Sequence, residues 1–168
     1  MSAVGATSTT GRTVVIGVGN PFRRDDGVGD VTVQRVRNLL PRGDRRVVVT
    51  SLDGEPTRLL DAWGGAGLAI VIDAMRSGAA PGSIERIEVD LDSPHPGVAL
   101  PAAASAGSTH SAGVGEAIGL GRVLGRLPGR LVVYGLEGAD FGEGPGLSPE
   151  ASCGVEVLTA RLCEELWC

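Results

Sequence analysis

Residues 14–30 read VVIGVGNPFRRDDGVGD, and this stretch decides the fold that the chain is expected to adopt. The apolar run 14–18 is typical of a fully buried strand. Pro21 ends it, because proline lacks a backbone N–H and disfavours the helical region for the residue before it. An apolar-periodic segment then begins at Val28. The chain thus passes from strand to polar loop to helix, and it places Asp25 and Asp26 at the junction of loop and helix.

Such a junction is a common place for a functional site. In open α/β sheets, sites form beyond the carboxyl ends of the strands. An acidic side chain at the start of a helix is also stabilised by the field of the helix N-terminus.

Outward from this stretch, short apolar runs alternate with amphipathic segments. Apolar spacing and the Gly and Pro residues between segments predict strands at 14–18, 46–52, 68–72, 83–89 and 130–136, and helices at 28–40, 57–63, 114–127 and 149–166. The strand at 83–89 alternates apolar with charged residues and is expected at an edge of the sheet. The order β-α-β-α-β-β-α-β-α indicates an α/β protein with a mostly parallel sheet and helices on both faces.

Length and composition are those of a single globular domain. The 168 residues are 42% hydrophobic and only 3% aromatic. We expect residues 1–12 to form a flexible tail and residues 13–168 to form one domain. A formal net charge of −5 argues against nucleic-acid binding, which needs a basic surface.

The setting expected from the sequence is the cytoplasm. No apolar run is long enough for a membrane helix, and the N-terminal stretch lacks the apolar core of a signal peptide. The three cysteines, Cys153, Cys163 and Cys168, have no metal-ligand spacing and are interpreted as reduced thiols.

Acidic residues follow the ends of the predicted strands. Asp26 comes after the first, Asp53 after the second, Asp73 after the third and Glu137 after the last, and His110 precedes the helix at 114–127. In a parallel sheet these acids gather along one edge. Two carboxylates with one imidazole suit a divalent transition metal, and so few ligands leave coordination positions open, as in a site that acts on a substrate.

Each of these residues also has a purely structural interpretation. Asp26 could be a helix-start acid, Asp73 a turn cap and His110 a neighbour of a helix cap. Glu137 and Asp140 could bind water or cap the last helix, for which Ser148 followed by Pro149 is a strong start signal.

The basic residues of the first loop also have two interpretations. Arg23 and Arg24 could form a solvated loop or recognise a carboxylate or main chain of a substrate. The sequence contains no G-x-S-x-G nucleophile elbow. The dinucleotide fingerprint G-x-G-x-x-G is incomplete, because Phe22 stands where its third glycine would be needed.

Five motifs in family order give the chain a resemblance to the nickel–iron hydrogenase maturation endopeptidases. The motifs are GVGNPFRRDDGVG (17–29), Asp-Gly (53–54), VIDAM (71–75), THSAGVGEAI (109–118) and GLEGADFGEGPGLSP (135–149). The resemblance spans about residues 13 to 166. It implies a three-layer α/β/α sandwich of the phosphorylase/hydrolase-like kind, with a five-stranded twisted sheet of which one strand is antiparallel.

The resemblance also implies an activity. Members of this family remove a C-terminal extension from the precursor of the hydrogenase large subunit after nickel has been inserted. The family's catalytic, nickel-contacting residues correspond to Asp26, Asp73 and His110, and Asp25 and Asp53 fall at substrate-binding positions. His95 has no counterpart and should be dispensable.

The resemblance further implies where the metal comes from and which partner is bound. Nickel would be supplied by the substrate precursor, although zinc or cadmium could occupy the site in vitro. Nickel would act as a Lewis acid or only as a recognition element. The partner would be the hydrogenase large-subunit precursor, with no nucleic acid and no membrane insertion, and the chain would work as a monomer.

Three alternatives remain open from the sequence. Peptidyl-tRNA hydrolases share a strand followed by Gly-x-Gly-Asn-Pro, but they need a His-Asn pair where this chain has Asp25 and Asp26. A non-catalytic nickel-binding or chaperone module for hydrogenase assembly would bind the precursor without shortening it. A protease of the same fold, such as the spore-protein proteases, would act on another precursor.

Overall fold

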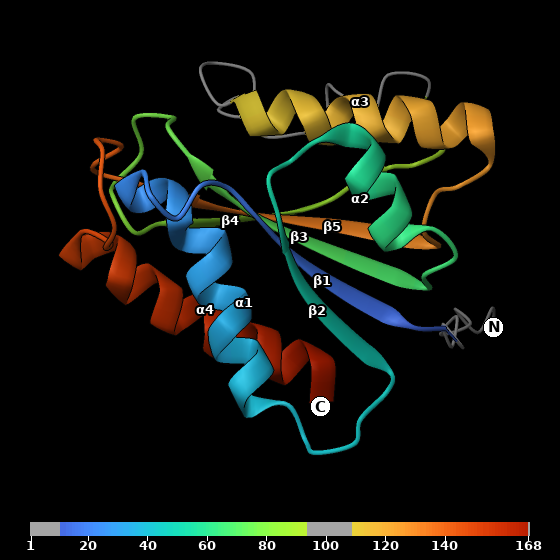
Figure 1. The fold of residues 1–168 in the computed structure, drawn as a ribbon, viewed down its shortest axis with the longest axis horizontal. Helices are drawn as coiled ribbons and strands as arrows, with labels where there is room; N and C mark the ends of the chain where they lie inside the picture. The colour runs from blue at the N-terminus through green and yellow to red at the C-terminus, as the bar shows by residue number, and fades with distance from the viewer. Residues whose placement is uncertain (1–10, 94–108, 168) are drawn as a thin grey trace, which may run out of the picture.

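A five-stranded twisted sheet forms the centre of the described part of the chain (Figure 1). The computed structural model describes residues 11–93 and 109–167. The strands lie in the order β2-β1-β3-β5-β4, all parallel except β4, which pairs antiparallel with β5. Their bounds are β1 Thr13–Val18, β2 Val47–Leu52, β3 Leu68–Met75, β4 Ile84–Glu88 and β5 Arg130–Glu137.

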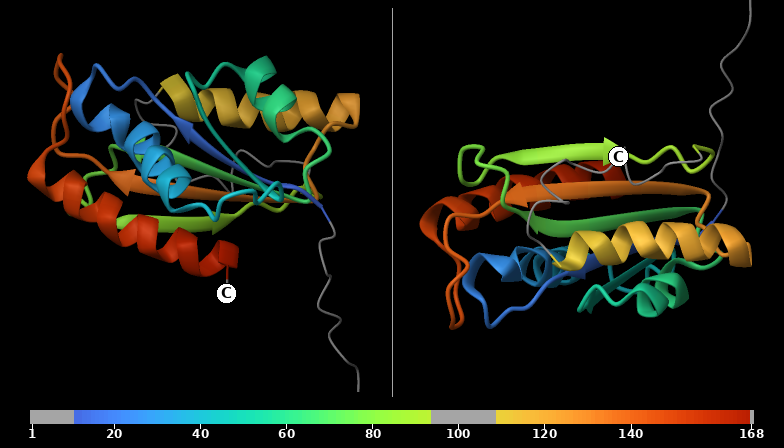
Figure 2. Two further views of the ribbon diagram at one scale, coloured as in Figure 1. Left: turned by 60° about the horizontal axis from the view of Figure 1, so that its bottom comes forward. Right: turned by 90° about the horizontal axis from the view of Figure 1, so that it is seen from above.

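Helices cover both faces of this sheet. They are α1 (Val28–Leu39), α2 (Pro56–Trp63), α3 (Thr109–Leu124) and α4 (Pro149–Trp167), and the short 3-10 helix η1 (Arg24–Gly27) precedes α1. Helices α1 and α4 pack together on one face, and α2 and α3 pack together on the other (Figures 1 and 2). The molecule is therefore a three-layer α/β/α sandwich, which confirms the predicted fold class.

Strand β1 shows why its sequence is an unbroken apolar run. Val14, Ile16 and Val18 face the core beneath α2 and α3, whereas Val15 faces the core beneath α1 and α4. All four side chains are buried. Because helices cover both faces, neither set of alternating positions can be polar.

The elements predicted from the sequence are confirmed, and three of their ends differ from the prediction by three residues or more. Strand β3 continues to Met75, three residues beyond its predicted end. Helix α3 begins at Thr109, five residues earlier than predicted, so His110 lies in its first turn, and it ends at Leu124, three residues before its predicted end. The side chain of Arg12, the last residue of the expected tail, donates to the carbonyls of Ala62 and Gly64 at 3.4 and 3.3 Å.

Three of the predictions fall on residues outside the described ranges. These are the flexibility of residues 1–10, the dispensability of His95 and the reduced state of Cys168.

Candidate active site

The site develops from the turn that follows β1. Gly19 has a φ of 139°, and a Cβ at this position would lie 2.0 Å from the carbonyl oxygen of Asp26. The turn therefore requires glycine. Beyond it, the backbone N–H of Asn20 donates to Asp26 Oδ2 at 2.9 Å, and the Asp26 N–H donates to the carbonyl of Arg23 at 3.1 Å. Asp26 is thus held from both sides, and only 5% of it is exposed.

A close crossing of helix and strand fixes the position of this loop. A Cβ on Gly17 in β1 would lie 2.3 Å from the carbonyl oxygen of Gly29 in α1. A Cβ on Gly29 would lie 2.6 Å from the carbonyl oxygen of Val18 and 2.7 Å from that of Ile72. The first turn of α1 therefore rests directly on the backbones of β1 and β3, which brings η1 against β3.

Asp73 lies inside β3 and not after it. Asp73 is paired with Gly135 of β5. The pairing between β1 and β3 ends one residue earlier, at Gly17 and Ile72. The Oδ1 atom accepts from the N–H of Ala74 at 2.9 Å, and Asp73 is 5% exposed. The pairing of β1 with β3 therefore stops before Asp73, and η1 is in contact with β3.

Two buried carboxylates therefore lie at the same edge of the sheet, on elements that touch. Removing a carboxylate from water is costly, and natural proteins accept this cost mainly at functional sites or in compensated networks. Carboxylate oxygens are also suitable ligands for divalent metals.

The main chain of His110 lies at this same edge. Three residues further along α3, a Cβ on Gly113 would lie 2.0 Å from the carbonyl oxygen of Gly54, in the loop after β2. The first turn of α3 thus contacts the loop that follows Asp53. The side chain of His110 is outside the described part, and among the side chains that are described no group of three or more His, Cys, Asp or Glu could hold a metal. The three-ligand set remains a prediction.

Asp25 has surroundings unlike those of its neighbour Asp26. It is fully buried. Its Oδ2 accepts from the N–H groups of Ala139 and Asp140 at 2.7 and 3.0 Å and from Ser148 Oγ at 2.7 Å, and its Oδ1 accepts from the Ser148 N–H at 2.7 Å. This carboxylate joins the first loop to the loop between β5 and α4, and the geometry favours a structural role over the predicted substrate contact.

The hydrogen bonds to Asp25 also determine its charge state. Burial by itself would raise the pKa of this carboxyl, but the bonds from Ser148, Ala139 and Asp140 together outweigh it and lower the pKa below the ordinary value. Asp25 is therefore a buried carboxylate stabilised by backbone and hydroxyl donors.

Asp53 remains accessible. It lies between β2 and α2, its Oδ2 atom pairs with Arg58 Nη1 at 2.9 Å, and 58% of its side chain is exposed. A partner that approaches this edge of the sheet can reach it, in keeping with the predicted role in substrate binding.

Two other acids have defined structural roles. Glu137 is 2% exposed and accepts from the N–H groups of Ser77 and Gly78 and from Ser77 Oγ, so it holds the turn between β3 and β4. Asp140 pairs with Arg24 at 3.4 Å, and neither acid caps the last helix. Ser148 does, by accepting from the Ala151 N–H at 3.2 Å, as predicted. Its second role as the main partner of Asp25 has no signal in the sequence.

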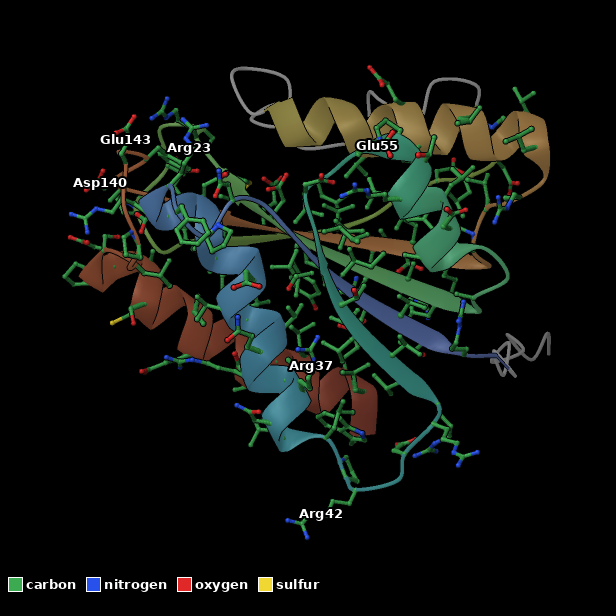
Figure 3. The ribbon with its side chains drawn as sticks, viewed as in Figure 1. Arg23, Arg37, Arg42, Glu55, Asp140 and Glu143 are labelled. Carbon is green, nitrogen blue, oxygen red and sulfur yellow. The ribbon has the colours of Figure 1, made fainter. Side chains whose placement is uncertain are left out.

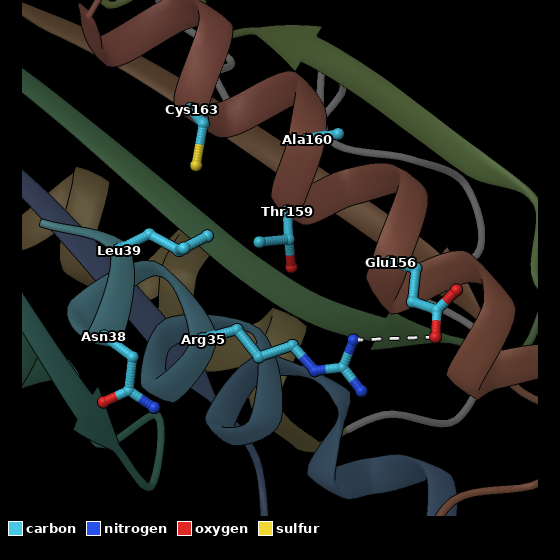
Figure 4. Close-up of a pocket in the computed structure, with 7 residues that line it drawn as sticks. All are labelled: Arg35, Asn38, Leu39, Glu156, Thr159, Ala160 and Cys163. Carbon is cyan, nitrogen blue, oxygen red and sulfur yellow. Dashed lines mark ion pairs between the residues drawn. The ribbon is translucent and has the colours of Figure 1, made fainter.

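A pocket of about 500 Å³ lies away from this edge, between α1 and α4 (Figure 4). Arg35 Nη1 of α1 and Glu156 Oε1 of α4 face each other across it at 3.9 Å. Cys163 lies further along α4 (Figure 4). Burial raises the pKa of the Cys163 thiol, which disfavours the nucleophilic thiolate. The pocket shows no arrangement of catalytic groups.

Comparison with protein families identifies the family of the chain. Residues 49–165 match the family model described as hydrogenase maturation protease. These residues contain Asp53, Asp73 and His110. A comparison with curated protein sequences gave no match.

Comparison with solved structures shows a shared fold. The hydrogenase maturating endopeptidase HybD from Escherichia coli has 24% identity and a TM-score of 0.73, over 92% of this chain and 91% of that one. An endopeptidase from Escherichia coli has 21% identity and a TM-score of 0.77, again over 92% of this chain and 91% of that one. The [NiFe] hydrogenase maturation protease HybD from Thermococcus kodakarensis has 22% identity and a TM-score of 0.66, over 92% of this chain and 98% of that one.

Proposed function

The chain belongs to the hydrogenase maturation protease family, and from this premise we propose that it removes the C-terminal extension of a nickel-loaded [NiFe]-hydrogenase large-subunit precursor. The reaction is hydrolysis: water adds across one peptide bond and the extension leaves as a free peptide. One observation supports this proposal above others. Asp26 and Asp73 are each 5% exposed, and they lie on elements that touch at the carboxyl edge of the sheet.

In this proposal the nickel belongs to the substrate. Asp26 and Asp73, with His110 from the first turn of α3, contact the metal that the precursor already holds. The enzyme then distinguishes loaded from empty precursor, because only the loaded form offers a cation to two buried carboxylates. Asp53, exposed beside the same edge, contacts the precursor around the cleaved bond.

The test is mass spectrometry of a precursor incubated with the purified chain. Loss of a C-terminal peptide is expected from the nickel-loaded precursor and not from the nickel-free one. Asp73→Asn and Asp26→Asn should each abolish the cleavage, because the amide removes the charge and retains the shape. Asp61→Asn is the matched control, since this aspartate lies on α2 with 72% of its side chain exposed and pairs with Arg126.

The result also distinguishes the protease from a non-catalytic chaperone for the same precursor. Tight binding of loaded precursor without any change in its mass would replace the protease by a chaperone function. Equal cleavage of loaded and nickel-free precursor would show that nickel is not recognised. Normal cleavage by both aspartate variants would remove them from the site.

A further inference from the structure

Phe22 is a large apolar side chain at the tip of the first loop, and 71% of it is exposed. The chain contains only two phenylalanines. The other one, Phe141, packs against the core beneath α1 and α4, with the guanidinium of Arg76 4.5 Å from the centre of its ring. Among the large apolar side chains that are exposed in the described residues, Phe22 is the one aromatic, and aromatic side chains contribute strongly to the binding energy of interfaces.

The loop that carries Phe22 is fixed in place by its backbone. The Phe22 N–H donates to Asn20 Oδ1 at 2.9 Å, and the Phe22 carbonyl accepts from the Gly144 N–H at 2.8 Å. Next to it, the Arg24 N–H donates to the Gly144 carbonyl at 2.9 Å. The buried Asp25 carboxylate ties the two loops together beneath this surface. A partner that binds here therefore meets a preorganised surface and pays little to order it.

The two arginines after Phe22 differ in what they bind. Arg24 pairs with Asp140 at 3.4 Å and donates to the carbonyl of Pro145 at 3.4 Å. Arg23 is exposed, and within residues 11–93 and 109–167 it forms no ion pair. Figure 3 shows it beside Glu143 and Asp140 at one corner of the molecule. Its guanidinium can therefore donate hydrogen bonds to a carboxylate of a partner.

The position of this surface connects it to the site. Phe22 and Arg23 precede Asp26 by four and three residues, and the hydrogen bond from Asn20 to Asp26 closes the loop between them. A peptide bound at Asp26 and Asp73 thus lies next to this loop. We propose that Phe22 and Arg23 form a docking pair for the precursor, in which the ring contacts an apolar side chain and the guanidinium binds a carboxylate on the segment beside the cleaved bond. This inference rests on the proposed function.

The test measures both KM for cleavage and direct affinity for the nickel-loaded precursor. Phe22→Ala and Arg23→Ala should each raise KM and Kd about tenfold, as truncation of an interface anchor does, with kcat retained within about twofold. Phe22→Leu and Arg23→Lys should recover part of the loss. The effect of Arg23→Ala should shrink as salt is added, and that of Phe22→Ala should not.

Exposed residues elsewhere provide matched controls. Val123→Ala removes a side chain that is 83% exposed on α3, and Arg42→Ala removes an exposed arginine in the loop between α1 and β2, at the opposite end of the molecule in Figure 3. Both should leave KM and Kd unchanged. All four side chains are exposed, so the variants should also keep the melting temperature of the wild type.

The outcomes distinguish the two proposals. If the wild type cleaves the precursor and the Phe22 and Arg23 variants match it in KM and Kd, the docking pair is wrong and the proposed function stands. If the variants lose kcat at unchanged KM, these residues act on catalysis and docking is also wrong. If the wild type neither cleaves nor binds nickel-loaded precursors, the proposed function fails and the docking pair fails with it.

Discussion

At the scale of single residues, Asp25 should matter for stability more than any other charged group in the first loop. Asp25→Ala would leave three backbone N–H groups and the Ser148 hydroxyl without their acceptor. Buried donors without partners are costly, so we expect a loss of about 3 kcal/mol or more in the free energy of unfolding. Urea denaturation of the purified chain measures it. Asp53→Ala, at an exposed site, should cost less than about 1 kcal/mol.

The same residue predicts a dependence on pH. Because the folded state lowers the pKa of Asp25, its contribution to stability is fully present above the ordinary carboxyl pKa and is lost as the pH falls through the lower folded value. The melting temperature of the wild type should therefore approach that of Asp25→Asn as the pH falls from neutral to below the ordinary carboxyl pKa. A gap between the two proteins that stays constant over this range would show that the Asp25 charge does not stabilise the fold.

At the scale of elements, the crossing of α1 over β1 and β3 should tolerate no side chain. Gly29→Ala forces a methyl group against the backbones of Val18 and Ile72, and backbone cannot move aside cheaply. We expect a loss of about 1–3 kcal/mol in stability and a further loss of activity, because η1 and Asp26 move with the helix. Thermal unfolding and the cleavage assay together measure both effects.

A helical glycine elsewhere is the control for this substitution. In α3, a Cβ on Gly119 would meet no atom within 4 Å. Gly119→Ala should therefore be neutral or stabilise the chain by up to about 1 kcal/mol through helix propensity. Equal stability of the two variants would disprove the close crossing.

At the scale of the whole molecule, stability should fall from the centre of the sheet to its edges. Strand β3 is buried along almost its whole length between β1 and β5, whereas the edge strand β4 contains no fully buried residue. Amide hydrogen exchange followed by mass spectrometry should show the slowest exchange in β1, β3 and β5, faster exchange in β2 and the fastest in β4. Exchange in β4 as slow as in β3 would mean that a further interaction protects this edge.

No helix in residues 11–93 and 109–167 combines the length and the apolar character that crossing a membrane requires. The monomeric state expected from the resemblance can be checked by sedimentation of the purified chain. A single species with the mass of one chain is the expected result.

The sequence by itself determined the elements, their order and the edge at which the acids lie. Apolar runs, helical spacing and the Gly and Pro residues between them are local signals, and they predicted all five strands and the four long helices. The right-handed connections of a parallel sheet then bring the carboxyl ends together without further information. The positions of Asp26, Asp73 and His110 after strands and before a helix made them candidates from the sequence pattern, whereas their catalytic roles and the antiparallel direction of the edge strand came from the family resemblance.

Only the tertiary structure decided what neighbouring residues of the same type do. Asp25 and Asp26 are chemically identical, yet the first is enclosed by the loop between β5 and α4, whereas the second accepts from Asn20 in its own loop and lies at the candidate site. The donors that make this difference lie more than a hundred positions away in the chain, where no local pattern reveals them. The exposed ring of Phe22 and the continuation of β3 past Asp73 have the same cause, because burial and strand pairing depend on partners that only the folded chain brings together.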